Sequence, residues 1–311
     1  MEWKWSKANE KSLARFVSDR AVELLPKLSA SPFELIQTRE GRLNLVRSIY
    51  DRLLNQGIQY AYEKYHPEEE IQRLRTPAEV LYAPGEGTCL DLALLFCGLC
   101  FGYELLPLLV VIEGHAFAAV SLNHQRREWN GFARERNLFN STELFRGEES
   151  GRALQKLIED EAYVAVECTG FARTRSFTGS MPEAVGRSPQ GTMIFDRAVA
   201  AGREQLENSG RGFLFAIDIA VAQYVWKIEP AALCERSEES SQPTSPDSAS
   251  SQTTTFGSIT FGNLSGNSIG NLVGGSLNYQ EAPKQIRKQI QIDLGEISDR
   301  EPSDSEEETN V

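Results

Sequence analysis

The sequence of 311 residues has little of several features that mark common protein classes. It has only five cysteines, and their irregular spacing favours a reducing compartment over a disulfide framework. Its 32 basic residues are outnumbered by 44 acidic ones, and the formal net charge of −12 argues against nucleic acid as the main partner. No uncharged apolar run reaches membrane-spanning length, and the first residues lack the apolar core of a signal peptide. We therefore expect a soluble cytoplasmic protein without a membrane span.

One long apolar run is present, at residues 90–101, and it predicts a helix that is buried on all sides. Gly87 supplies a turn before the run and Thr88 is suited to cap the helix. Asp91 falls in the first turn, where a carboxylate interacts favourably with the helix dipole. Cys89 would then begin the helix, where unpaired backbone N–H groups favour a thiolate. This placement makes Cys89 a candidate nucleophile rather than only a small buried side chain.

A candidate base and a candidate acid follow the apolar run. His115, one of only three histidines, lies at a glycine break between two buried-strand patterns. A third strand pattern ends at Glu167, which Thr169 follows closely. Cysteine, histidine and acid in this order are typical of a nucleophile, its general base and the group that orients the base. We expect Cys89, His115 and Glu167 to form a triad, against the simpler readings of a packed core histidine and a turn-capping acid.

Three short segments resemble the motifs of the transglutaminase-like (papain-fold) cysteine protease superfamily: GTCLDLA at 87–93, GHAF at 114–117 and ECT at 167–169. In that superfamily G-x-C-x-(D/E)-x-A precedes a helix, G-H-(A/F/W) lies on a strand, and D-x-T lies on the next strand. Glutamate replaces the aspartate of the third motif here. This replacement is common in a bacterial subgroup that is attached to helicase-type and conflict-system (antiviral defence) proteins. The resemblance covers roughly residues 40–230.

The resemblance implies an α+β fold in which a central helix packs on an antiparallel sheet. It implies a thiol protease without cofactor or metal, acting on a protein or peptide through Cys89, His115 and Glu167. The backbone N–H of Cys89 is the natural oxyanion donor, and Tyr82 is a candidate side-chain helper. Two alternatives stay open: a catalytically inactive papain-fold scaffold that binds peptides, and a transferase that cross-links or deamidates proteins.

The other cysteines have simpler explanations. Cys97 and Cys100 form a C-x-x-C pair, which could indicate redox chemistry or zinc binding. They lie inside the apolar run without a second pair, so core packing explains them better. Cys168 neighbours Glu167 and is a candidate second thiol, although successive strand residues face opposite sides. His66 and His124 have no motif context and are expected at the surface.

The remaining patterns divide the chain into segments. Residues 1–39 form an N-terminal helical segment, and whether it packs on the catalytic domain at 40–230 stays open. Within this domain we expect a helix at 40–65 divided at Gly57, an insertion after His115 that includes a helix at 148–161, a helix at 193–207, a buried strand at 212–222, and a closing strand and turn at 224–230.

The composition changes abruptly in the C-terminal quarter of the chain, from residue 231 on. We expect a disordered Ser/Thr-rich linker at 231–255 and a disordered acidic tail at 281–311. Between them, residues 256–280 lack charge and repeat Gly-Asn, which fits either a flexible linker or stacked strands with asparagine ladders. The second reading resembles the amyloid-like signalling motifs by which bacterial NLR-like sensors seed effectors. It implies self-assembly or an NLR-like sensor as partner.

Overall fold

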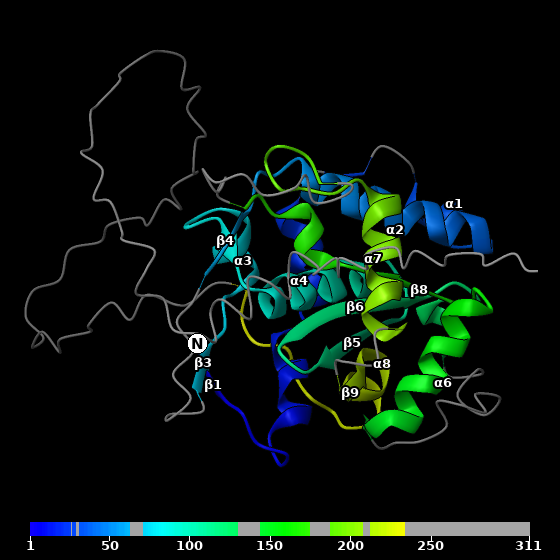
Figure 1. Cartoon of the computed structure of the whole chain (residues 1–311). Helices are drawn as coiled ribbons and strands as arrows, with labels where there is room; N and C mark the ends of the chain where they lie inside the picture. The colour runs from blue at the N-terminus through cyan, green and yellow to red at the C-terminus, as the bar shows by residue number, and fades with distance from the viewer. Residues whose placement is uncertain are drawn as a thin grey trace, which may run out of the picture.

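The computed structural model describes residues 1–25, 27–28, 31–62, 71–129, 144–174, 187–207 and 212–233. The α+β class is confirmed, since helices pack around an antiparallel sheet (Figure 1). Within the described ranges no helix is both long and apolar enough to cross a membrane. The predicted motif at 256–280, the tail at 281–311 and all but the first three residues of the predicted linker lie outside these ranges.

The helices and strands alternate irregularly along the chain. The α-helices are α1 (Pro32–Leu35), α2 (Arg39–Leu54), α3 (Pro77–Leu81), α4 (Cys89–Gly102), α6 (Gly147–Glu159), α7 (Phe195–Glu207) and α8 (Ile219–Tyr224). The 3₁₀ helices are η1 (Glu10–Phe16), η2 (Asp19–Leu24), η3 (Arg126–Glu128) and η4 (Cys168–Phe171). The strands are β1 (Glu2–Lys4), β2 (Gln59–Tyr60), β3 (Ile71–Arg73), β4 (Glu86–Gly87), β5 (Pro107–Ile112), β6 (His115–Ser121), β7 (Phe145–Arg146), β8 (Tyr163–Val166) and β9 (Phe213–Asp218).

The main sheet has five strands in the order β7-β9-β5-β6-β8, and every neighbouring pair is antiparallel. The central strand β5 is joined to its neighbour β6 by a two-residue turn, in which Gly114 adopts a φ of +73°. This conformation suits glycine, which has no Cβ to clash. The turn pairs Ile112 with His115, so the predicted glycine break places the histidine at the very start of β6.

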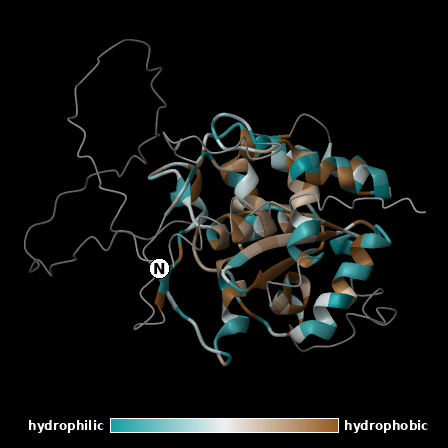
Figure 2. Ribbon diagram, viewed as in Figure 1, coloured by the Kyte–Doolittle hydropathy of each residue, from teal (hydrophilic) through white to brown (hydrophobic). Residues whose placement is uncertain are grey.

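The two faces of the sheet belong to different layers. Alternate residues of each strand point to opposite sides, so Leu109 and Val111 face the larger core while Leu108 and Val110 face a smaller one. Helix α4 packs on the larger-core face, and α6 covers the other face. Figure 2 shows α4 and the sheet strands in hydrophobic colours, with hydrophilic positions mainly on the outer helices.

Helix α4 occupies the centre of the larger core, as predicted. Every residue from Cys89 to Phe101 is buried, because α2, the sheet and the N-terminal segment surround the helix. Gly98 allows the backbone of the N-terminal segment to come close, since a Cβ there would lie 2.6 Å from the carbonyl oxygen of Ser18. Leu13 and Val17 also belong to the larger core. The segment whose packing was left open therefore packs against the same helix.

Three sequence predictions about the extent or presence of elements are wrong. Helix α2 ends at Leu54 and does not continue to residue 65, because Gly57 adopts a φ of +73° and the chain then extends into β2. The strand predicted at 212–222 ends at Asp218, whose side chain accepts hydrogen bonds from two backbone N–H groups and starts α8. No described residue after β9 belongs to a strand, so the predicted closing strand at 224–230 is absent.

The other predicted elements are present. The strands expected on either side of His115 are β5 and β6, and the third is β8, which ends one residue before Glu167. The helix expected at 148–161 is α6, and the one expected at 193–207 is α7.

Candidate active site

The N-terminus of α4 is held by a reciprocal hydrogen-bond pattern. The Thr88 hydroxyl accepts from the backbone N–H of Asp91 at 3.3 Å. The Asp91 carboxylate accepts from the backbone N–H of Thr88 at 3.0 Å. This capping box confirms the predicted roles of both residues at the helix start. It places Cys89, 8% exposed, as the first residue of the helix.

A buried ion pair ties this helix start to the segment before it. The Arg75 guanidinium donates to Asp91 at 3.0 Å and to Glu86 at 2.8 Å, and the Arg75 backbone N–H donates to Asp91 at 2.9 Å. Burial raises the pKa of Asp91, against the hydrogen bonds from Arg75 and Thr88. The sequence pointed to the segment that starts at Arg75, because its R-T-P-x-E-V-L pattern resembles a lead-in that packs beside the catalytic helix in the resembled family. It gave Arg75 itself no partner; the structure supplies Asp91 and Glu86.

The structure brings the three predicted site residues together. The Nε2 atom of His115 lies 2.7 Å from the Oε2 atom of Glu167, and Cys89 is near enough to be one of the groups that raise the pKa of His115. The imidazole therefore links the cysteine at the helix start to the acid that follows β8. His115 begins β6, and β8 pairs antiparallel with β6, so Glu167, directly after β8, lies near the start of β6.

The charges of this cluster depend on one another. Burial by itself lowers the pKa of His115, but the charge of Glu167 and the hydrogen bond to Cys89 outweigh it and leave this pKa well above its usual value. Burial likewise raises the pKa of Glu167, but the charge of His115 and the hydrogen bonds from His115 and Thr169 lower it to about 2. An imidazolium and a carboxylate therefore stabilise each other inside the protein.

Four donors surround the Glu167 carboxylate, which is only 2% exposed as a residue. The Thr169 backbone N–H and hydroxyl donate to Oε1 at 3.0 and 2.9 Å. Gln205 donates to Oε2 at 3.3 Å, beside His115. A buried carboxylate needs such partners, because an unpaired charge in the interior is costly. The E-x-T spacing thus has a physical reason: the threonine two residues later fixes the orientation of the acid.

Gln205 is a site residue that sequence reasoning missed. It comes from α7, 38 residues beyond Glu167. Helix α7 approaches β8 closely at Gly202, where a Cβ would lie 2.9 Å from the Ala165 carbonyl carbon and the Val166 nitrogen. No local pattern reports such an approach, since it depends on how the helix packs on the sheet edge.

The remaining candidates lie elsewhere or are engaged. Cys97, Cys100 and Cys168 are fully buried, and burial raises the pKa of each thiol. Core packing is therefore the role of the C-x-x-C pair, as predicted. The Tyr82 hydroxyl donates to the Leu24 carbonyl, so it is committed to a partner outside the triad.

Two further points concern metals and the other histidines. Over the ranges that the structure describes, no group of three His, Cys, Asp or Glu side chains could hold a metal ion. His124 is half-buried after β6, and His66 lies outside the described residues.

Chemically, the arrangement presents a thiol, a base in contact with it and an acid that orients the base. Cys89 is the first residue of α4, so its backbone N–H belongs to the unpaired N–H groups of a helix start and is the candidate oxyanion donor. Comparisons with protein-family models, with curated proteins and with solved structures found no match. A functional assignment therefore depends on the geometry of Cys89, His115 and Glu167.

Proposed function

We propose that the protein is a thiol hydrolase that cleaves amide bonds in proteins or peptides, with Cys89 as nucleophile. The observation that carries this proposal is the His115–Glu167 hydrogen bond of 2.7 Å, next to Cys89 at the start of a buried helix. The resemblance of the three motifs to transglutaminase-like proteases supports the same assignment. The antiparallel sheet beneath α4 is consistent with a papain-like core.

The proposed reaction has two stages. His115 takes the proton from the Cys89 sulfur, which attacks the amide carbonyl carbon, and Glu167 stabilises the resulting imidazolium. The negative oxygen of the tetrahedral intermediate accepts from the Cys89 backbone N–H. His115 then gives the proton to the leaving amine, and a thioester with Cys89 forms. Water, deprotonated by His115, attacks the thioester, releases the acid and restores the thiol.

An inactive peptide-binding scaffold is the second candidate, and burial of the site favours it. Cys89 is 8% exposed and His115 is 4% exposed, so a substrate reaches the sulfur only if neighbouring groups move. The pairing of charges around His115 favours the enzyme instead, because a scaffold needs no imidazole held between a thiol and a carboxylate.

The alkylation rate of Cys89 as a function of pH distinguishes the two. In the wild type we expect a rate plateau that extends well below neutral pH, because an imidazolium keeps the sulfur as a thiolate. In His115→Ala we expect rates that rise only near the value for a free thiol, about pH 8.5. Cys89→Ala identifies the labelled site, and Cys168→Ser is the matched control because its thiol is buried away from solvent. Rates that rise near pH 8.5 in both proteins would favour the scaffold.

We further propose that the protein is a cytoplasmic effector that assembles through residues 256–280, either with copies of itself or on an NLR-like sensor. The assembly would raise the local concentration of the enzyme and so activate hydrolysis. A synthetic peptide covering 252–280 should form thioflavin-positive fibres. A peptide that stays soluble and unstructured at high concentration would remove assembly from the proposal and leave the hydrolase untouched.

A further inference from the structure

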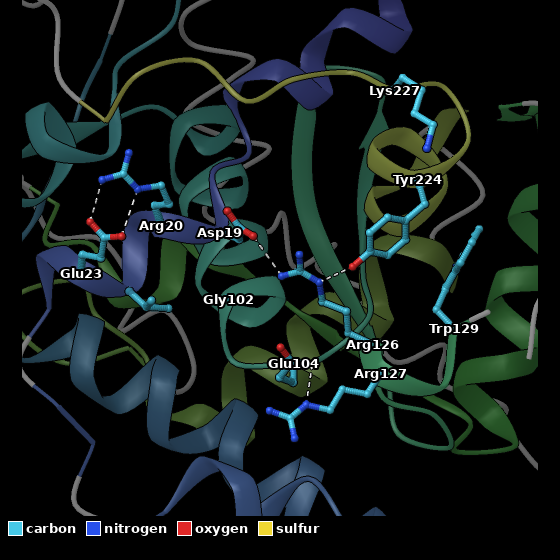
Figure 3. A pocket seen from close by; sticks show the side chains of 11 residues that line it. Asp19, Arg20, Glu23, Gly102, Glu104, Arg126, Arg127, Trp129, Tyr224 and Lys227 are labelled. Carbon is cyan, nitrogen blue, oxygen red and sulfur yellow. Dashed lines mark hydrogen bonds and ion pairs between the residues drawn. The ribbon is translucent and has the colours of Figure 1, made fainter. Parts of the chain in front are cut away.

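A large cavity lies at the opposite end of α4 from Cys89. Its volume is about 760 Å³, within the range of small-molecule sites. Four separate parts of the chain line it: η2, the end of α4, the segment around η3 and the end of α8 (Figure 3). The proposed hydrolase does not use this cavity, since α4 is 14 residues long and so separates the two sites by about 20 Å.

The charged side chains of the cavity wall include one cation more than they have acids to pair with. Each acid of the wall has an arginine partner: Asp19 with Arg126 at 3.0 Å, Glu23 with Arg20 at 3.0 Å, and Glu104 with Arg127 at 3.3 Å. Lys227 also lines the cavity and forms no ion pair with any described residue. A surplus positive charge is notable in a chain with a net charge of −12.

Two of the wall residues have an unusual backbone. Glu104 has a φ of +67° and Lys227 a φ of +58°, and only one other non-glycine residue in the described ranges, Glu161, has a positive φ. Both follow a helix end, α4 and α8, at the left-handed position that glycine favours. A charged side chain at such a position costs stability, and strained residues of this kind cluster at ligand sites. The side chains of both residues with a strained backbone line the same cavity.

One arginine in the wall is structural and not available to a ligand. Arg126 donates to the Tyr224 hydroxyl at 2.6 Å and to the Phe101 carbonyl at 3.0 Å, and its guanidinium lies 3.8 Å from the centre of the Phe101 ring. It therefore fixes Tyr224 in place (Figure 3). Trp129 packs beside Tyr224, with ring centroids 5.1 Å apart. Together these rings give the cavity an aromatic wall near Lys227.

The remaining two arginines can change partners. The side chains of Arg20 and Arg127 are 68% and 57% exposed, and exposed ion pairs contribute little stability. An anion that enters the cavity would therefore meet an unpaired ammonium at Lys227, while Arg20 and Arg127, in other parts of the wall, can exchange partners at small cost. A neutral or cationic ligand would not form an ion pair with the Lys227 ammonium group.

We propose that this cavity binds a small organic anion, whose carboxylate or phosphate group pairs with Lys227 and whose planar or apolar part packs against Trp129 and Tyr224. The site is separate from the triad and does not depend on the proposed hydrolase.

The test is a titration of the ¹⁵N-labelled full chain, followed through the indole N–H signal of Trp129. The signal is assigned with Trp129→Phe. Benzoate and phenyl phosphate are the anionic probes, and benzyl alcohol is their neutral counterpart. We expect a saturable shift of the signal with at least one anion and none with the alcohol. Benzoate alone or phenyl phosphate alone would identify the group as a carboxylate or a phosphate.

Lys227→Asn removes the charge but keeps a residue that tolerates a left-handed backbone, so the fold should be retained. We expect it to weaken anion binding by about ten-fold or more, as for the loss of one charge-assisted contact. Lys156→Gln, an exposed lysine on α6, is the matched control and should bind like the wild type. Absence of a saturable shift with both anions, or equal binding by Lys227→Asn with an unchanged melting temperature, would overturn the proposal.

Discussion

The charged side chains at the two ends of α4 differ in how deeply they are buried and how completely they are paired. At the start of the helix, the side chains of Arg75 and Asp91 are 6% and 0% exposed and every carboxylate oxygen of Asp91 has a donor. At the other end, the side chains of Arg20 and Glu23 are 68% and 53% exposed and Lys227 has no ion pair in the described structure. A buried charge network must be complete, because each missing partner leaves a charge without water. An exposed network can exchange partners, which suits the binding of a ligand, whereas the buried network holds the start of the helix in one conformation.

The largest expected effect is on stability at the buried end. Asp91→Ala removes the acceptor of both Thr88 and Arg75, so it leaves a buried guanidinium without one of its partners. We expect the free energy of unfolding to fall by about 3–5 kcal/mol, as for other broken buried pairs. Urea unfolding followed by circular dichroism measures it.

Two comparisons sharpen that prediction. Asp91→Asn keeps an acceptor for Thr88, so its loss should be smaller. Glu23→Ala breaks the exposed pair at the other end of the helix and should leave the unfolding free energy unchanged within error. Equal losses for Asp91→Ala and Glu23→Ala would mean that the two ends do not differ in the way described.

A smaller effect should appear with pH. The raised pKa of His115 means that its contribution to stability is complete below about pH 6.5, the ordinary histidine value, and is lost as pH rises toward the folded pKa. The loss has an upper limit of about 1.4 kcal/mol per pH unit. Glu167 has a lowered pKa, so its contribution is present above about pH 4.3 and is lost as pH falls toward its folded value of about 2.

Unfolding free energies of wild type and His115→Gln over a series of pH values measure both contributions. The wild type should lose stability relative to the variant between pH 6.5 and the alkaline range. Parallel curves for the two proteins across that range would show that His115 does not gain a proton on folding. They would contradict the conclusion that the His115 imidazole is charged in the folded protein.

The smallest effect concerns backbone strain at the open end. Glu104→Gly places the favoured residue at a left-handed position, so we expect a gain of about 1 kcal/mol in the free energy of unfolding. Glu161→Gly, which relieves the same strain outside the cavity, should gain a similar amount. A loss of stability in Glu104→Gly alone would mean that the Glu104–Arg127 pair outweighs the strain.

Local patterns predicted much of the fold around the triad. The apolar run predicted α4, and Gly114 predicted the turn before His115, because helix burial and tight turns depend on neighbouring residues. The same kind of pattern failed beyond Leu54, where apolar residues at helical spacing continue but Gly57 turns the chain into a strand. It failed again at Asp218, whose capping side chain starts a helix inside an apolar run that looks like a strand.

The sequence by itself determined the start of α4, with Thr88 and Asp91 as its cap, and the order of Cys89, His115 and Glu167 along the chain. These depend on contacts within a few residues or on motifs that can be read directly. Only the tertiary structure decided that Arg75 supports the helix start and that Gln205 supports Glu167. It alone brought Glu104 and Lys227 to the wall of one cavity. Such contacts join residues far apart in the chain, and they form only when helices pack on the sheet and on each other at distances that no local pattern encodes.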